Sequence, residues 1–417
     1  MTDKIAVIGL GYVGLPLAIE FSKKYQTFGY DFNQDRIDSL NKGFDVTGEV
    51  SNKILSDSNL ILTSKVASIK SCNIYIIAVP TPINLENKPN LKALINASTN
   101  IGKILSKNNI VIYESTVYPG CTEEICVPIL ESVSGLKFNS DFFCGYSPER
   151  INPGDKKRTL TKIIKVTSGS DNKTLDKVDF LYKSIIDEGT FPVSSIKVAE
   201  AAKIIENCQR DINIAFVNEL AMLFNLMTID TKEVLEAAGT KWNFLPFTPG
   251  LVGGHCIGVD PYYLTYRAEE LGFKSKIILS GRKLNDSMVN YVYSRIEKKF
   301  VEKSIKINRA KILLLGITFK ENCTDSRNSK LIDLYNILKN KKINVNVYDP
   351  LAIQSDLNYY NINLLSYSEI DKNKYDCIII GVSHNEFKNI NIKALLRNSN
   401  SIVFDIQGTY KDKFERL

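Results

Sequence analysis

The segment "KIAVIGLGYVGLPLAIEFSKKYQTFGYD", residues 4–31, decides the expected fold of the chain. Residues 4–10 form a short apolar run typical of a buried strand, residues 11–25 place apolar side chains at helical spacing, and residues 27–31 are again extended. A strand, a helix and a second strand in this order predict a βαβ unit, which is the building block of a parallel sheet.

Three glycines in this segment, Gly9, Gly11 and Gly14, form the pattern G-x-G-x-x-G between the first strand and the helix. Gly9 permits a tight turn, Gly11 lets the backbone approach a pyrophosphate, and Gly14 allows the helix to pack closely on the strand. The helix N-terminus adds N–H donors and a positive dipole. We therefore expect a dinucleotide site that includes Tyr12 and Val13. The alternative is a glycine turn in an α/β fold that binds no nucleotide.

One carboxylate indicates which dinucleotide binds. Asp31 follows Gly11 by about twenty residues, at the end of the second strand. In that position a carboxylate accepts hydrogen bonds from the adenosine ribose and repels a 2′-phosphate, so the expected cofactor is NAD rather than NADP. Arg36 is a candidate for softening this preference, although it fits a solvated helix face better.

Further strand-like runs at residues 73–80, 109–116 and 141–150 alternate with helical stretches, which predicts a parallel, doubly wound sheet. Ligands of such sheets bind at the carboxyl ends of the strands. Four residues at these ends are candidates for lining the cofactor: Pro80, Thr81, Ser115 and Thr116. Without the glycine motif, each position would be read as an ordinary turn after a strand.

A second alternation of strands and helices begins near residue 309. Between residues 195 and 300 helical periodicity dominates and includes one helix of roughly 30 residues, about 45 Å long. The expected fold class is α/β, with two Rossmann-like, doubly wound parallel sheets joined by a long helix and a helical connector. The expected domains are residues 1–194, 195–300 and 301–417.

The composition argues against several classes of protein. Of 417 residues, 44% are apolar and 24% are charged, and no apolar run approaches the roughly 18 residues of a membrane span, so we expect a cytoplasmic protein. The eight cysteines include no C-x-x-C pair, so neither a metal site nor a disulfide framework is predicted, and most should be buried thiols. The net charge of +7 fits anionic ligands, whereas no recognition motif for nucleic acid is present.

The predicted helix at residues 198–220 separates a polar side from an apolar side. Its polar side carries four residues: Glu200, Lys203, Asn207 and Arg210. A solvated helix face explains them without any function, but a place between two nucleotide-type domains favours contact with an anionic substrate. The apolar side, from about Ile204 to Leu223, fits either packing within the chain or a dimer interface.

The segment "LVGGHCIGVD", residues 251–260, places a cysteine beside one of the two histidines of the chain. Gly253 and Gly254 permit unusual backbone angles and close approach of a ligand. A buried, inert thiol is the simplest interpretation of Cys256. In an NAD enzyme, however, a thiolate makes a second oxidation possible: it attacks an aldehyde to give a thiohemiacetal, loss of hydride gives a thioester, and water releases an acid. Asp260 completes this constellation.

Taken in order, these motifs resemble the nucleotide-sugar 6-dehydrogenase family, the UDP-glucose and UDP-N-acetylhexosamine dehydrogenases. The resemblance covers nearly the whole chain, in "KIAVIGLGYVGLPLA", "ESTVYPG", "SPERINPGD", "AEAAKIIENCQRDINIAFVNELA", "GGHCIGVDPYYL" and "GITFKENCTDSRNS". It implies that Cys256 is the nucleophile and that Lys203 and Asp260 organise proton transfer with water. It also implies that Glu149 assists hydrolysis of the thioester.

The same resemblance implies that Thr116 and Asn207 position water or an oxyanion. It assigns the C-terminal α/β domain to the UDP moiety, with Lys320 on the substrate. It places Arg327 near the active site and the cofactor, reaching across a subunit boundary in some members, and it implies a homodimer.

The string "SPERINPG", residues 147–154, resembles the branch of the family that acts on N-acetylated sugars. Arg150 and Asn152 are candidates for contacting the acetamido group. The remaining candidates for substrate binding are Glu149, Lys203, Asn207, Arg210 and Gly253. The stereochemistry that separates GlcNAc, GalNAc and ManNAc is not readable from this segment.

The leading hypothesis is therefore the NAD-dependent, four-electron oxidation of C6 of a UDP-N-acetylhexosamine, UDP-GlcNAc or UDP-GalNAc, to a uronic acid for surface polysaccharide such as capsule. UDP-ManNAc and UDP-glucose are the alternative substrates. A more remote alternative is a two-electron β-hydroxyacid dehydrogenase, which would leave Cys256 and the C-terminal domain without a role. A non-enzymatic protein that binds NAD is the third possibility.

Overall fold

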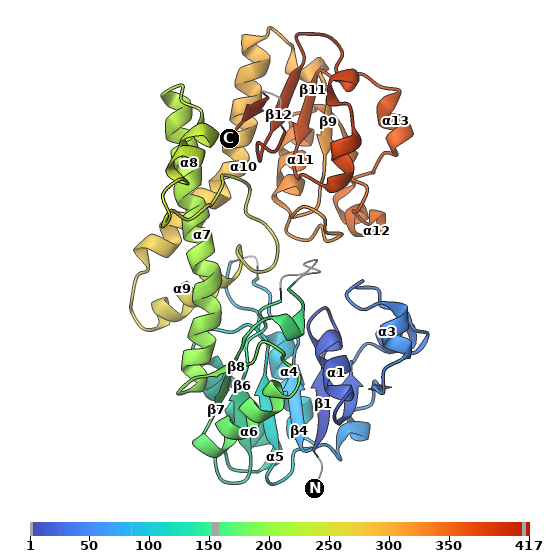
Figure 1. Ribbon diagram of the computed structural model, residues 1–417, viewed down its shortest axis with the longest axis vertical. Coiled ribbons are helices and arrows are strands. Elements are labelled where there is room, and N and C mark those ends of the chain that lie inside the picture. The colour runs from blue at the N-terminus through green and yellow to red at the C-terminus, as the bar shows by residue number, and fades with distance from the viewer. Residues whose placement is uncertain (1–2, 85, 152–157, 411–413) are drawn as a thin grey trace. The chain divides into compact units, whose positions relative to one another are not determined.

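The structure is a computed structural model that describes these residues of the chain: 3–84, 86–151, 158–410 and 414–417. The chain divides into two compact units, the first made of Met1–Glu206 with Tyr262–Phe273, and the second made of Asn207–Pro261 with Lys274–Leu417. Each unit is built around its own sheet, as Figure 1 shows.

The sheet of the first unit has the strand order β3-β2-β1-β4-β5-β6-β7-β8. The strands are β1 (Lys4–Ile8), β2 (Gln26–Tyr30), β3 (Ile61–Thr63), β4 (Ile74–Ile77), β5 (Ile110–Tyr113), β6 (Phe143–Tyr146), β7 (Lys165–Gly169) and β8 (Thr190–Pro192). β1 pairs in parallel with both β2 and β4. The chain therefore builds the sheet outward from β1, first toward β2 and β3 and then, on the other side, from β4 onward. Ligands of doubly wound sheets bind at the carboxyl ends of the strands at this switch point.

The α/β fold class and the predicted strands of this unit are confirmed. The sequence pattern did not show three short strands, β3, β7 and β8. β7 pairs antiparallel with β6, through Gly145↔Gly169 and Tyr146↔Ser168, whereas β8 is parallel to β7. The outer edge of the sheet thus departs from the all-parallel arrangement that was expected.

Helices cover both faces of the first sheet. α1 (Gly14–Ser22), α2 (Gln34–Asn41), α3 (Asn52–Ser56) and α6 (Asn172–Lys183) contribute to one apolar cluster with Ile112 of β5. Side chains alternate along a strand, so Tyr113 points to the opposite face. There its hydroxyl lies 2.8 Å from that of Ser98 in α4 (Lys92–Gly102), which packs beside α5 (Val127–Ser134).

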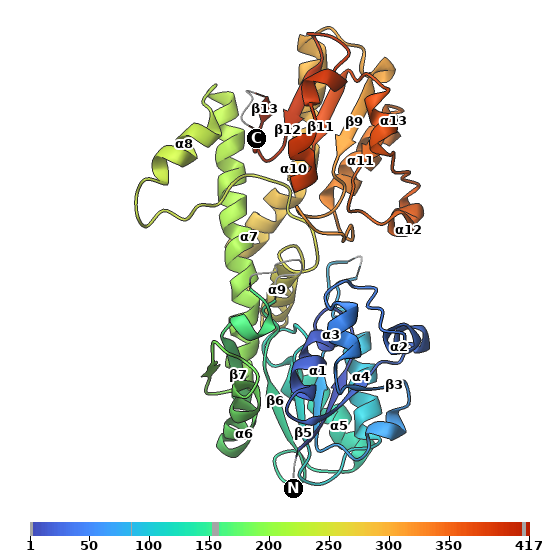
Figure 2. The same cartoon turned by 45° about the vertical axis from the view of Figure 1, so that its right-hand side comes forward.

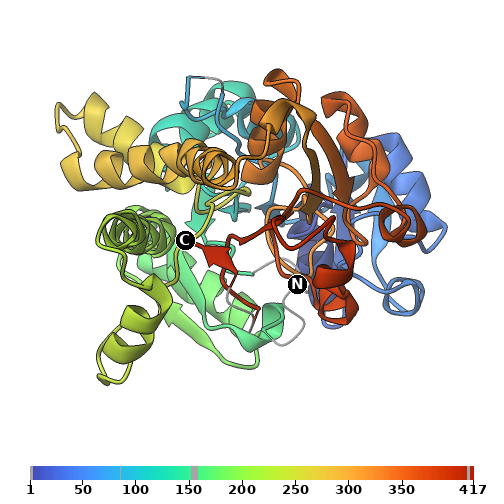
Figure 3. The same cartoon turned by 90° about the horizontal axis from the view of Figure 1, so that it is seen from above.

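Residues 195–300, all of which the structure describes, contain helices and no strand, as predicted. The helices are α7 (Ile196–Leu226), α8 (Thr231–Ala238), α9 (Asp260–Glu270) and α10 (Lys276–Glu302). α7 has 31 residues, which confirms the long helix, and Figure 3 views it along its axis. None of the helices in the described part of the chain combines the length and the apolar character that a membrane span requires.

The sheet of the second unit is parallel throughout and has the order β10-β9-β11-β12-β13. The strands are β9 (Lys311–Leu315), β10 (Asn344–Tyr348), β11 (Cys377–Ile380), β12 (Ile402–Asp405) and β13 (Glu415–Arg416). The helices between them are α11 (Lys330–Asn340), α12 (Gln354–Leu357) and α13 (Tyr367–Asp371). Figure 2 shows β9, β11 and β12 side by side.

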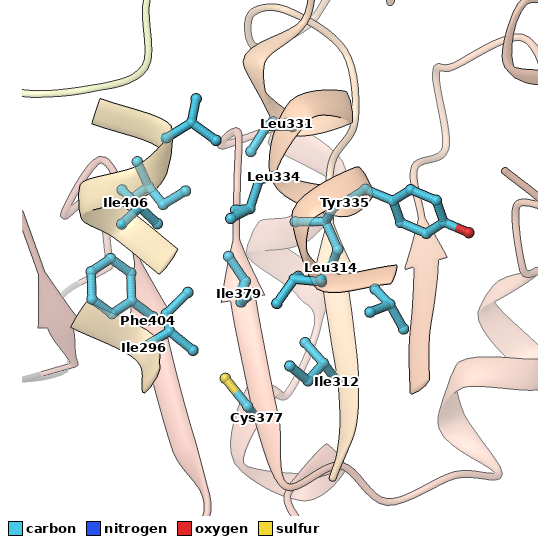
Figure 4. Packing of buried hydrophobic residues seen from close by; sticks show 14 of the residues in the cluster. Ile296, Ile312, Leu314, Leu331, Leu334, Tyr335, Cys377, Ile379, Phe404 and Ile406 are labelled. Atoms are coloured by element: carbon cyan, nitrogen blue, oxygen red, sulfur yellow. The ribbon is translucent and has the colours of Figure 1, made fainter. Parts of the chain in front are cut away.

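The core of the second unit lies on both faces of this sheet. α10 and α11 pack on one face against residues such as Leu314, Ile379 and Phe404 (Figure 4). The intervening residues Leu313 and Ile378 point to the other face, toward α13 and two short 3-10 segments. Because both faces are covered, the strands are continuous apolar runs, as in "KILLL" and "CIII".

Candidate active site

The glycine turn between β1 and α1 has the geometry of a dinucleotide cradle. Gly9 has φ of 91°, and a Cβ at Gly14 would lie 1.8 Å from the carbonyl oxygen of Gly9, so both positions require glycine for the protein's own folding. At Gly11, in contrast, a Cβ would meet no atom of the described residues within 4 Å. Gly11 is exposed, with Tyr12 and Val13 half-buried beside it. The open space at Gly11 therefore fits the pyrophosphate of NAD.

Asp31 lies at the end of β2, half-buried, and its carboxylate is held by the backbone. Its Oδ2 accepts the N–H of Leu10 at 2.9 Å, and its Oδ1 accepts the N–H of Asn33 at 3.0 Å. This orientation keeps a negative charge at the edge of the glycine turn, which disfavours a 2′-phosphate. The residues present fit NAD.

The prediction that Arg36 lies on a solvated helix face is wrong. Its side chain is 9% exposed, and its guanidinium donates to the carbonyl oxygen of Leu10 at 2.7 and 2.9 Å and to Asp45 at 2.7 Å. These partners come from the glycine turn and from a loop after α2, so α2 alone could not reveal them. Arg36 shapes the turn from inside the protein.

The residues after β4 and β5 are tied to each other. The hydroxyl of Thr81 donates to the carbonyl oxygen of Thr116 at 2.6 Å, and that of Ser115 donates to the carbonyl oxygen of Val79 at 2.6 Å. Pro80 is exposed beside them. The structure thus brings the four predicted cofactor residues of these two loops together at the carboxyl edge of the first sheet.

Glu149 and Arg150 follow β6 in the first unit. Glu149 is 9% exposed, and its Oε1 accepts the N–H of Arg150 at 2.6 Å. The guanidinium of Arg150 donates to the carbonyl oxygen of Ile164 at 2.7 Å and pairs with Glu206 at 2.8 Å. The predicted substrate contact Asn152 lies outside the described residues.

The polar side of α7 is largely buried, so a solvated face is the wrong interpretation for Glu200 and Lys203, which are 0% and 8% exposed. The Glu200 carboxylate accepts the N–H groups of Gly120 at 2.5 Å and Thr122 at 2.9 Å. Burial raises the pKa of Glu200 to about 7. The structure describes all four residues of this polar side, and of these only Arg210 is exposed.

Asn207 and Asp260 meet in the second unit. The side-chain amide of Asn207 donates to Oδ2 of Asp260 at 2.5 Å, and both residues are buried. The backbone N–H groups of Asp260 and Val259 donate to the carbonyl oxygen of Cys256 at 2.9 and 3.0 Å, so Cys256 lies in the turn that begins α9. The thiol and this hydrogen-bonded carboxylate are therefore four residues apart in one tight turn.

Exposure separates Cys256 from the other cysteines of the chain. Cys256 is half-buried, whereas the other seven are buried. Burial raises the pKa of Cys72 to about 11 and that of Cys208 to about 12, which keeps both thiols protonated and unreactive. The prediction of mostly buried thiols is confirmed. Cys256 is the exception, and its partial exposure is what a nucleophile needs in order to reach a substrate.

The loop that carries Cys256 docks on the segment after β9 within the second unit. His255 Nε2 lies 3.1 Å from Oδ2 of Asp325, and the N–H of Gly254 donates to the carbonyl oxygen of Asn328 at 3.2 Å. Asp325 also accepts from the guanidinium of Arg327 at 2.7 Å, and these contacts hold the pKa of Asp325 well below its usual range. The structure therefore joins the cysteine loop to Arg327 through one shared carboxylate.

Gly253 and Lys320 lie at the same docking surface. A Cβ at Gly253 would lie 2.6 Å from the carbonyl oxygen of Asn328, which gives this glycine a packing role. Phe319 packs edge-on against His255, and the ammonium of Lys320 lies 5.5 Å from the centre of the Phe319 ring. Both predicted substrate residues therefore belong to the second unit.

A small hollow lies at the carboxyl ends of β9 and β11, where the neighbours of β9 in the sheet order are β10 on one side and β11 on the other. Its lining includes Leu251 from the start of the cysteine loop and Phe319 and Gln407 from the sheet edge. Asp349 occupies the place that Asp31 has in the first sheet, but it is 4% exposed and lies 3.1 Å from His384 Nε2. This second sheet therefore offers a nucleotide a different set of contacts from the first.

These features define an NAD-dependent dehydrogenase with a second α/β domain and a half-buried thiol. The family models that match the chain are described as the NAD binding domain (residues 3–186), the central domain (197–287) and the UDP binding domain (313–412) of the UDP-glucose/GDP-mannose dehydrogenase family. The chain belongs to the UDP-glucose/GDP-mannose dehydrogenase family.

Relatives span nearly the full chain. A UDP-N-acetyl-D-glucosamine 6-dehydrogenase from Pseudomonas aeruginosa is 53% identical, covering 97% of this chain and 96% of its own length. A protein of the same name from Salmonella typhi is 51% identical, with coverage of 98% and 94%. The solved structure of a UDP-D-ManNAc dehydrogenase from Pyrococcus horikoshii has a TM-score of 0.90 and 31% identity, and the match covers 99% of this chain and 98% of that one.

Sequence reasoning missed several residues at these sites. Asp325 had no motif of its own, although it lies in the quoted "GITFKENCTDSRNS". Glu114 and Lys165 form a buried ion pair beside Glu149, and Phe32, next to Asp31, is 85% exposed at the edge of the first sheet. Two features of the sequence could have indicated them. Phe32 directly follows Asp31, and Glu114 directly follows an apolar strand.

Proposed function

We propose that this chain is an NAD-dependent UDP-N-acetyl-D-glucosamine 6-dehydrogenase, which oxidises the C6 hydroxyl of its substrate to a carboxylate. The observation that carries the proposal is the half-buried Cys256 in a loop that begins at the wall of the hollow in the UDP binding domain. The two relatives that bear this enzyme name are 53% and 51% identical, whereas relatives named UDP-N-acetyl-D-mannosamine dehydrogenase are 30–34% identical. Identity therefore favours GlcNAc over ManNAc.

The chemistry follows from what a thiol does to an aldehyde. The glycine turn would hold two NAD molecules in succession, and each would take up one hydride: the first oxidises the C6 alcohol to an aldehyde, and the second oxidises the adduct of that aldehyde with Cys256. Cys256 adds to the aldehyde carbon and makes it tetrahedral, so that a second hydride can leave and a thioester remains. Hydrolysis of the thioester releases the acid and restores the thiol. A two-electron oxidation would give Cys256 no task.

The polar residues divide between proton transfer and hydrolysis. We assign proton transfer to Lys203 and to Asp260, whose carboxylate is oriented by Asn207. Thr116 and Asn207 position water or the oxyanion, because a developing negative charge needs hydrogen-bond donors. Glu149 is the base that activates water against the thioester.

A panel of UDP-sugars tests the choice of substrate. NADH formation is followed with UDP-GlcNAc, UDP-GalNAc, UDP-ManNAc and UDP-glucose at equal concentration, and kcat/KM is compared. We expect UDP-GlcNAc to be the best substrate, with UDP-GalNAc second. A higher kcat/KM with UDP-ManNAc or UDP-glucose contradicts the proposed specificity, and binding of NAD without turnover of any of them contradicts the enzymatic function.

We infer a homodimer formed through the helices of residues 195–300. The apolar side of α7 named above packs within the chain at Ile204, which is 0% exposed, but other apolar side chains remain on the surface. Leu226 and Trp242 are 84% and 92% exposed, and a dimer interface would remove this apolar surface from water. Light scattering of the wild type and of Trp242→Asp checks this, since a dimer should weaken in the variant. A cytoplasmic location and a role in surface polysaccharide remain predictions.

A further inference from the structure

A buried cluster of charged side chains lies behind Glu149 in the first unit. The ammonium of Lys165 on β7 lies 2.7 Å from Oε2 of Glu114, which follows β5, and 3.7 Å from Oε2 of Glu149. The hydroxyl of Tyr182 on α6 donates to Oε1 of Glu114 at 2.5 Å. The side chains of Lys165 and Glu114 are 3% and 0% exposed, so water does not screen these charges.

The two oxygens of Glu149 have different surroundings. Oε1 accepts the N–H groups of Arg150, at 2.6 Å, and of Ile151. Oε2 is buried and has no hydrogen-bond partner among the described residues, and Lys165 is the cation that it faces. Because Oε1 is already used by the backbone, the orientation of Oε2 depends on the Lys165 ammonium.

We propose that Lys165, anchored by Glu114, is a positioning residue for the hydrolytic step, because its ammonium faces Oε2 of Glu149 and holds the carboxylate of Glu149 in place. This inference rests on the proposed function, in which Glu149 activates water against the thioester. The assignment extends the reaction machinery to a residue that touches neither substrate nor cofactor. It predicts that Lys165 matters for release of the acid and much less for the two oxidations that precede it.

The charges around Glu149 support this reading. Glu114 is a second carboxylate near the same lysine, and burial raises its pKa to about 7, against the lowering effect of Lys165. Tyr182 keeps its proton, since burial and Glu114 raise its pKa well above the usual value. Arg150 is paired with Glu206 of α7. Lys165 therefore contacts Glu114 directly and also faces Glu149.

The test separates hydrolysis from oxidation in the full-length enzyme. Lys165→Met is mixed with NAD and UDP-GlcNAc, and the NADH burst and the mass of the acid-quenched protein are measured at pH 7 and pH 9. We expect a burst of about two NADH per active site, a steady state slowed by about tenfold or more, and a thioester adduct on the protein. Higher pH should restore part of the turnover, because hydroxide attacks a thioester without help from an oriented carboxylate.

The matched control is Lys162→Met. Lys162 precedes β7, and it forms a surface pair with Asp187 in which the side chains are 53% and 60% exposed. Its removal takes away the same charge from the same unit, so turnover should match the wild type and no adduct should accumulate. If Lys165→Met behaves like this control, or slows every step equally without an adduct, the proposal is overturned.

A double variant tests whether Lys165→Met loses turnover only because the first unit is destabilised. Lys165→Met leaves the buried Glu114 without its cation, which destabilises the unit. Glu114→Gln/Lys165→Met removes that carboxylate as well, and we expect it to fold and still accumulate the thioester. If the double variant regains wild-type turnover, Lys165 serves only to neutralise Glu114, and the inference fails. The wild-type yield of NADH per acid tests the proposed function separately, because it does not depend on Lys165.

Discussion

The side-chain amide of Asn207 donates a hydrogen bond of 2.5 Å to the buried carboxylate of Asp260. Asp260 in turn lies at the end of the turn that begins with Cys256, and its backbone N–H binds the carbonyl oxygen of the cysteine. One amide on α7 therefore orients the carboxylate that accompanies the thiol. This hydrogen bond connects α7 to the turn that carries Cys256.

We expect Asp260→Asn to lower kcat by about 100-fold or more, since the amide cannot accept a proton. The fold should be retained, because the two side chains have nearly the same shape, and circular dichroism checks this. Asp333→Asn is the matched control: this aspartate pairs with Lys330 on the surface, where it is 54% exposed. Equal activity of the two variants would show that the Asp260 carboxylate has no chemical role.

Gly11 and Gly14 should respond in opposite ways to alanine. The new Cβ in Gly11→Ala meets no atom of the described residues within 4 Å, so the melting temperature should hold while the KM for NAD rises by about tenfold or more. Gly14→Ala places a Cβ 1.8 Å from the carbonyl oxygen of Gly9 and should destabilise the first unit itself. Thermal melts and NAD titrations distinguish the two effects. An unchanged KM in Gly11→Ala would place the pyrophosphate elsewhere.

Cofactor choice should depend on Asp31 and not on Arg36. Asp31→Ser removes the charge that repels a 2′-phosphate, so the ratio of kcat/KM for NAD over NADP should fall by about tenfold. Efficient use of NADP should still not appear, because the Arg36 guanidinium is bound to Leu10 and Asp45 inside the protein. Strong NADP activity in this single variant would mean that Arg36 leaves these partners.

Stability should fall as the pH rises from about 5 to 7. Burial raises the pKa of both Glu114 and Glu200 from the ordinary 4.5 to about 7, so the folded chain binds more protons than the unfolded chain in this window. Each group then costs about 1.4 kcal/mol of stability per pH unit until it is ionised in both states. Urea unfolding at pH 5, 6, 7 and 8 measures the slope. Glu114→Gln should reduce it, and an unchanged slope would contradict the assignment.

Local periodicity was enough to predict most of the fold. The apolar runs at β1, β4, β9 and β11 and the helical spacing along α7 are properties of contiguous residues, so the chain itself displays them. β3 and β8 have three residues each, and β7 carries a lysine and two hydroxyl residues. Such short or polar strands are stabilised by their neighbours in the sheet, which the local pattern does not contain.

The candidate site was harder to predict where its contacts join distant parts of the chain. Glu114 and Lys165 are 51 positions apart, and Arg36 binds both the glycine turn and a loop beyond α2. A charged residue in a local pattern is normally exposed, so its burial can be seen only when the partner is known. The glycine motif and the cysteine loop were recognisable because their residues are close together in the sequence.

The yield of NADH per molecule of UDP-GlcNAc consumed tests the central role of Cys256 most directly. Wild-type enzyme and Cys256→Ala are compared, with the product identified by mass. We expect two NADH and the uronic acid for the wild type, and no acid for the variant. One NADH with a free aldehyde from the wild type, or acid formation without the thiol, would contradict this role of Cys256.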